Sequence, residues 1–127
     1  MNGHQLGIYQ SVDTTTADPA RIVVLLYDGA IRFLLQAREG LDKGDTGAFA
    51  QRLSRAHAII GELSGALNPE AGGDIAANLG RLYDFMLLHL TQGLIAKSRA
   101  HVSVVVDLLQ ELRDGFEAAV RASRHAA

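Results

Sequence analysis

The sequence contains no cysteine among its 127 residues. Without thiols the chain can form neither a disulfide framework nor a thiolate metal site, which favours a reducing, cytoplasmic setting. An excess of basic residues is also missing, because 12 Lys and Arg residues stand against 14 Asp and Glu residues, for a formal net charge of -2. Proteins that bind the phosphate backbone depend on such an excess, so the sequence does not predict nucleic-acid binding.

Targeting signals and long apolar runs are lacking as well. No Lys or Arg precedes Arg21 and no apolar core region precedes it either, so no secretory signal peptide is expected. The apolar stretches are too short or too interrupted to span a bilayer, and no membrane insertion is expected. Hydrophobic residues still make up 48% of the chain, which is enough for one domain with a single buried core.

Apolar residues recur at three- and four-residue intervals in four successive segments, the spacing of amphipathic helices. Asp18 is a candidate cap for the first, and Pro19 suits the first helical position. Asp74 is the candidate cap of the third, after the break in "LNPEAGGD". The run "VSVVV" in the fourth would suit a strand, but no partner strand exists. The expected helices cover residues 19–43, 49–67, 74–94 and 102–119.

Four such helices with short polar connections predict an all-α fold, an antiparallel four-helix bundle. Residues 1–17 have no helical pattern and are interpreted as a mobile N-terminal cap, extended or short-helical, before a single bundle domain at 18–127. This leader nevertheless carries Leu6, Ile8 and Tyr9. Large apolar side chains need a surface to bury them, which the bundle or a partner would supply.

Cofactor, metal and catalytic sites find little support. A di-iron bundle needs Glu-x-x-His on two helices, but no Glu here is followed by His three residues later. His57, His89 and His101 lie on three segments without ligand spacing. The run "GGDIAANLG" lacks the strand and the Lys of a phosphate-binding loop, and is interpreted as a helix break and start. No Cys nucleophile or strand-turn Ser exists, so the chain is not expected to be an enzyme.

The third segment is apolar on more than one side. A small bundle needs one buried face per helix, so the surplus, including Tyr83, should line a groove or form an exposed patch. A central helix with more neighbours would explain the same pattern. Either way the leader's apolar residues could dock beside it, as a displaceable lid or as a fixed strap.

Several blocks occur in an order that resembles the flagellar secretion chaperone FliS family: "IYQ", a Thr-rich spacer, "LLYDGAIRFL", "GELSGALN" and "GGDIAANLGRLYDFM". The resemblance runs from about residue 8 to about residue 120. The C terminus departs from the commoner family pattern, since "EAAVRASRHAA" follows Phe116 without a Trp.

The resemblance implies a cytoplasmic export chaperone that binds the disordered C-terminal segment of flagellin. Binding would prevent premature polymerisation and support delivery to the flagellar type III export apparatus, and export-gate and flagellar regulatory proteins are candidates for further partners. The alternatives are a metal- or ligand-binding bundle and a self-associating structural module. The matching positions form the predicted partner-binding site: Ile8, Tyr9, Gln10, Asn78, Leu79, Leu82, Tyr83 and Met86.

Overall fold

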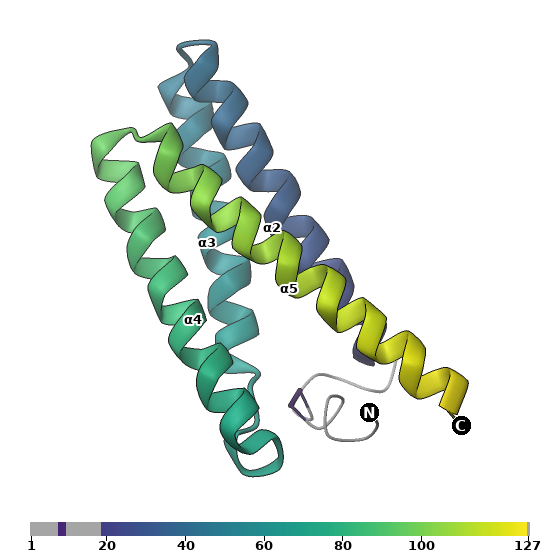
Figure 1. The fold of residues 1–127 in the computed structure, drawn as a ribbon. Coiled ribbons are helices and arrows are strands. Elements are labelled where there is room, and N and C mark those ends of the chain that lie inside the picture. The colour runs from purple at the N-terminus through teal and green to yellow at the C-terminus, as the bar shows by residue number, and fades with distance from the viewer. Residues whose placement is uncertain (1–7, 10–18, 127) are drawn as a thin grey trace.

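A computed structural model describes residues 8–9 and 19–126 of the chain. The described part holds four helices and no strand: α2 (Pro19–Asp42), α3 (Thr46–Gly65), α4 (Pro69–Ala96) and α5 (Arg99–Ala126). Consecutive helices run in opposite directions (Figure 1). The predicted all-α antiparallel bundle is confirmed, and the valine run lies within α5.

The helices form a ring in which α2 and α4 each pack against both α3 and α5. Helices α2 and α4 therefore lie diagonally across the bundle, and their outward faces point in opposite directions. Every helix contributes to one continuous apolar core, as the spacing predicted. Fully buried members include Tyr27, Leu34, Leu53, Ile60, Tyr83, Met86, Leu90 and Leu109.

The first two helices begin and end close to the predicted positions. Helix α2 starts at Pro19 and ends at Asp42, while the proposed cap Asp18 lies outside the described residues. Helix α3 starts before its first large apolar residue because Asp45 caps it, with the side-chain oxygen accepting a bond of 3.0 Å from the Ala48 N–H.

The predicted break before Asp74 is present, but the third helix starts earlier than predicted. Helix α4 begins at Pro69, and the Asn68 side chain caps it by accepting a 3.1 Å hydrogen bond from the Ala71 N–H. The glycine break is present inside the helix as a kink, since Gly73 has φ 52° and ψ −130°. This conformation is open to glycine and strained for residues with a Cβ. The chain thus makes one extra turn of helix before the kink, and that turn meets the leader.

Candidate partner-binding site

The described part of the leader lies against the bundle. Ile8 and Tyr9 are each 2% exposed, and Figure 1 places this pair between the start of α4 and the C-terminal half of α5. The Ile8 carbonyl accepts a 2.7 Å hydrogen bond from the Asn68 N–H. Asn68 therefore caps α4 with its side chain and holds the leader with its backbone.

The first glycine of "GG" makes room for this contact. A Cβ added at Gly72 would lie 3.2 Å from Ile8 Cγ1 and 2.7 Å from the Ala76 Cβ. Only glycine lets the extra turn of α4 approach Ile8 so closely. The interpretation of "GGDIAANLG" as a helix break and start was therefore incomplete, because Gly73 supplies the kink and Gly72 supplies the docking surface.

All three tyrosines of the chain meet at this site. The Tyr83 hydroxyl lies 2.5 Å from the Tyr9 hydroxyl and 2.5 Å from the Tyr27 hydroxyl. Phe116 completes this tyrosine cluster, edge-on to Tyr9 with ring centroids 6.1 Å apart. Burial is the main cause that raises the pKa of all three phenols, so the cluster stays neutral. The leader is joined to α2, α4 and α5 through one set of rings.

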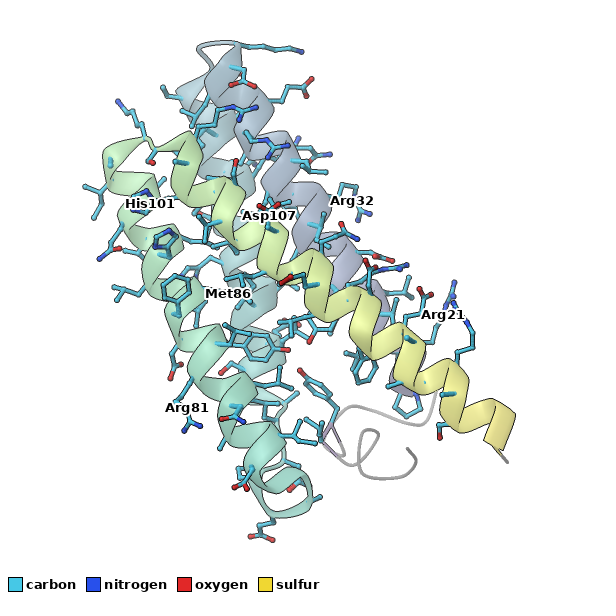
Figure 2. All side chains as sticks on the ribbon, viewed as in Figure 1. Arg21, Arg32, Arg81, Met86, His101 and Asp107 are labelled. Atoms are coloured by element: carbon cyan, nitrogen blue, oxygen red, sulfur yellow. The ribbon has the colours of Figure 1, made fainter. Side chains whose placement is uncertain are left out.

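The predicted site residues divide into several groups. Tyr83 and Met86 are fully buried, and Met86 lies inside the bundle in Figure 2. Leu79 and Leu82 are half-buried against the core, and Asn78 is exposed, accepting a hydrogen bond from Arg81. Gln10 lies outside the described residues. The structure thus joins Tyr9 to Tyr83, but Tyr83 is not the exposed side chain that the apolar surplus suggested.

The apolar surplus of α4 is carried by other residues. Phe85, Leu88 and Ile95 are 45%, 60% and 80% exposed, and positions three and seven apart share one side of a helix. We call these three residues the α4 strip. Their spacing was visible in the sequence, but only the packing shows that Tyr83 turns inward while Phe85 and Leu88 turn outward.

A shallow groove lies at the seam of α3 and α4, and Thr91 in its wall stands three and four residues from Leu88 and Ile95 of the α4 strip. Its volume is about 200 Å³, and its walls are formed by Leu53, Ser54, His57, Thr91 and Leu94. An apolar strip next to such a groove is the geometry that receives an amphipathic helix of a partner.

Phe85 of the α4 strip also belongs to a stack of three rings that extends to α5. The Phe85 and His89 rings lie 4.9 Å apart, and the His89 and His101 rings 4.2 Å apart, with interplanar angles of 21° and 24°. The His101 Nδ1 lies 2.7 Å from the Ser98 hydroxyl oxygen. The sequence indicated no relation between these histidines, because their contact depends on how α4 and α5 pair.

Replacing Gly72 with alanine should release the leader. The added Cβ cannot coexist with Ile8 and Ala76 at their present positions. The phenol of a released Tyr9 should then ionise near its ordinary pKa of about 10, whereas the buried cluster resists ionisation. Absorbance during an alkaline titration reports this directly, since the chain has 3 Tyr and no Trp.

Gly61→Ala is the matched control, because nothing lies within 4 Å of the Cβ that it adds to α3. It should stabilise the helix by up to about 1 kcal/mol and leave the titration unchanged. An unchanged titration in a folded Gly72→Ala variant would contradict the close approach.

Acidic conditions should weaken the bundle at the ring stack. Partial burial, and then the neighbouring His101, lower the pKa of His89. The native state therefore binds fewer protons than the unfolded chain once the pH falls below the ordinary histidine pKa of about 6.5. The contribution of His89 to the free energy of unfolding is present above that pH and is lost below it. Melting temperatures between neutral and mildly acidic pH should fall less in His89→Gln than in the parent. His57→Gln, on α3, is the control, and equal slopes in parent and His89→Gln would exclude this role.

Over the residues that the structure describes, no group of three or more His, Cys, Asp or Glu side chains could hold a metal ion. Within the same residues, no helix combines the length and the apolar character that a membrane span requires.

The chain is similar to known flagellar proteins over most of its length. The family model described as "Flagellar protein FliS" matches residues 2–123. The flagellar secretion chaperone FliS of Vibrio cholerae is 35% identical over 109 residues, which cover 84% of this chain and 80% of the relative. The FliS chaperone of Bacillus subtilis is 28% identical over 116 residues, covering 91% and 86%.

A solved structure shows the same fold. The crystal structure of a flagellar chaperone from bacteria superposes with a TM-score of 0.77 at 24% identity, covering 90% of this chain and 93% of that one. The bundle, the leader motif and the family match lead to one assignment, which agrees with the resemblance seen in the sequence. The chain belongs to the FliS family, which is a family of flagellar chaperones and not of enzymes.

Proposed function

We propose that this chain is a cytoplasmic export chaperone that binds the disordered C-terminal segment of flagellin, prevents its premature polymerisation and supports its delivery to the flagellar type III export apparatus. Family membership supports the chaperone role. The observation that carries the binding mode is the α4 strip, three large apolar side chains that remain exposed, two of which, Leu88 and Ile95, adjoin Thr91 of the α3–α4 groove.

The chemistry of this surface suits a disordered client. A segment that folds on binding must offset its own ordering cost, and burial of apolar area is the main source of that free energy. The strip presents Phe85, Leu88 and Ile95 within three turns of one helix. A client helix with apolar residues at three- and four-residue intervals would cover the strip and insert into the groove.

The leader forms the second part of the proposed site. We assign residues 1–17 to a mobile cap and 18–127 to the bundle domain, with the cap occupying part of the client's surface in the free protein. Its docking surface includes Asn68, Gly72 and Tyr83. The partner-binding residues that we propose are Ile8, Tyr9, Gln10, Asn78, Leu79, Leu82, Tyr83 and Met86, together with the α4 strip. Those of these residues that are buried in the free protein contact the client after the cap has left the bundle.

Truncating Phe85 to alanine should weaken flagellin binding. Its ring is about half exposed in the free chaperone, so the loss in a client complex should be at least about 1 kcal/mol, with a small effect on stability. Isothermal titration with a synthetic flagellin C-terminal segment measures it. The complex should show one-to-one stoichiometry, a negative heat-capacity change and weak dependence on salt.

Leu25→Ala is the matched control, since Leu25 is 51% exposed on α2, diagonally across the bundle. It should bind the segment like the parent chain. Equal affinity of the Phe85→Ala variant would remove the strip from the site. The exposed strip also fits a self-associating module, and sedimentation with and without the flagellin segment separates the two functions.

A further inference from the structure

The outward face of α2 carries a second surface, which the proposed function does not use. Arg21, Leu25, Arg32 and Leu35 are exposed, and their spacing of four, seven and three residues puts them on one side of the helix. We call these four residues the α2 strip. Figure 2 shows Arg21 and Arg32 on the side of the bundle away from Arg81 of α4.

Carboxylates also occur on this face of α2, but each of them is already engaged. Asp28 accepts from Arg113 of α5 at 2.8 Å, and Asp42 accepts from Arg99 of α5 at 2.9 Å. Glu39 pairs with Lys43 at 3.4 Å. The acidic groups of α2 thus serve to hold neighbouring helices and side chains.

The arginines of the strip lack such partners. Neither Arg21 nor Arg32 has an ion pair with a carboxylate in the described part of the chain. The Arg32 guanidinium instead lies 5.9 Å from the Phe33 ring centroid, and Arg55 of α3 lies 5.8 Å from the same ring. The face therefore keeps unmatched positive charge next to exposed leucines, in a chain whose net charge is -2.

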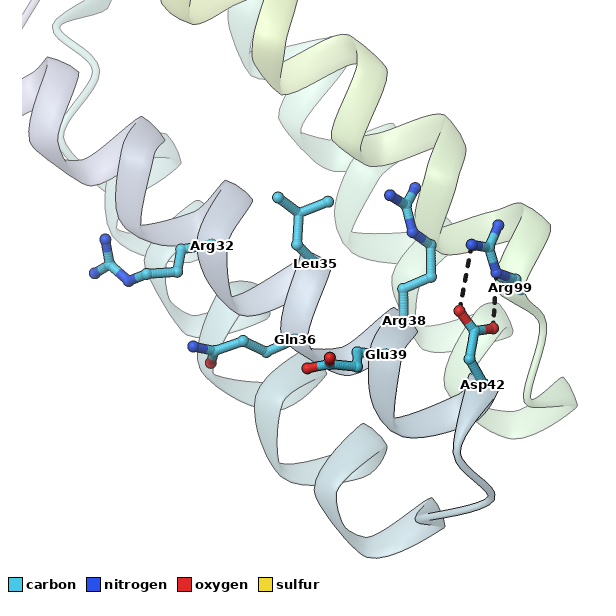
Figure 3. A pocket seen from close by; sticks show the side chains of 7 residues that line it. All are labelled: Arg32, Leu35, Gln36, Arg38, Glu39, Asp42 and Arg99. Atoms are coloured by element: carbon cyan, nitrogen blue, oxygen red, sulfur yellow. Dashed lines mark hydrogen bonds and ion pairs between the residues drawn. The ribbon is translucent and has the colours of Figure 1, made fainter.

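A hollow of about 420 Å³ lies at one end of the strip, where Leu35 and Arg38 stand between Arg32 and the Asp42–Arg99 pair (Figure 3). Gln36 lines the same hollow, and its side-chain oxygen is buried without a hydrogen-bond partner among the described residues.

We propose that the α2 strip binds an acidic amphipathic helix of a partner protein, with carboxylates facing Arg21 and Arg32 and apolar side chains facing Leu25 and Leu35. Helices α2 and α4 are diagonal in the bundle, so this partner and the α4 strip's client can be bound together. An anionic membrane or a nucleic acid fits less well, because the carboxylates Asp28, Glu39 and Asp42 neutralise the basic groups that they pair with, whereas such surfaces depend on a large basic excess.

The test uses a designed helical peptide of about 18 residues, or about five turns, with Glu and Leu at the intervals of the strip. Fluorescence anisotropy with the full chain should show binding that weakens as salt rises. The variant Arg32→Glu should lower the affinity at least about tenfold. Arg81→Glu, the same charge change on α4, should leave it unchanged. The paired variant Ile8→Ala with Tyr9→Ala should also bind the peptide normally, which separates this surface from the proposed flagellin site.

Three outcomes would overturn the proposal. The first is equal binding of the same peptide with Lys in place of Glu. The second is preferential binding of the full chain to phosphatidylserine vesicles over the peptide, lost in Arg32→Glu. The third is a dimer in sedimentation that Arg32→Glu dissociates, since the strip's occupant would then be a second copy of the chain.

Discussion

Replacing Tyr83 with alanine should lower the free energy of unfolding by about 3 to 5 kcal/mol, the usual cost of emptying a buried aromatic site. Tyr83 is fully buried and lies within hydrogen-bond distance of Tyr9 and Tyr27 at once. Because of this burial, Tyr83→Ala is a poor probe of flagellin binding, as it would disturb the bundle and the leader together. Chemical denaturation followed by circular dichroism measures the loss.

Tyr83→Phe separates the hydroxyl from the ring. The substitution keeps the packing but removes the central hydroxyl, which leaves Tyr9 and Tyr27 short of a partner at a cost of about 1 to 3 kcal/mol. The conservative variant should therefore fall between the parent and Tyr83→Ala. A Tyr83→Phe variant as stable as the parent would show that the two short contacts add nothing to stability.

Deleting residues 1–12 should destabilise the bundle and yet not weaken client binding. Burial of Ile8 and Tyr9 contributes about 2 to 4 kcal/mol after the cost of ordering the leader. If the leader covers part of the flagellin surface, the apparent affinity is reduced by the fraction of time that it is docked, so deletion should tighten binding.

The same measurements distinguish a lid from its alternatives. A strap would reveal itself by lost thermal stability with no change in affinity, whereas a direct contact would lose affinity. The paired variant Ile8→Ala with Tyr9→Ala controls for the length of the deletion, and Gly72→Ala releases the leader without changing its sequence. Weaker client binding by a stable deletion variant would rule out the lid and make the leader part of the binding site.

Helices and core positions were predictable because they depend on local spacing. The stripe through α2 and the break after α3 could be read from three- and four-residue intervals and from Pro69. The cap of α4 was assigned to Asp74 instead of Asn68, because both residues are good caps and the sequence cannot show that a glycine kink continues the helix.

The site was less predictable, since it depends on contacts between distant segments. Tyr9, Tyr27 and Tyr83 belong to three different parts of the chain, and no pattern in the sequence indicates that their hydroxyls converge. The sequence also left open which of Tyr83 and Phe85 points into the core. Tyr83 and Phe85 are two positions apart and so point about 200° apart on the helix, which means that only one of them can face the core, and the packing of α4 decides which.

The most direct test of the proposed function compares full-length flagellin with flagellin that lacks its C-terminal segment, in titrations against the full chaperone chain. Our proposal predicts a one-to-one complex with full-length flagellin, weakened in Phe85→Ala, and no complex with the truncated protein. Equal binding of the two flagellins would contradict recognition of the C-terminal segment, and absence of binding to both would contradict the proposed client.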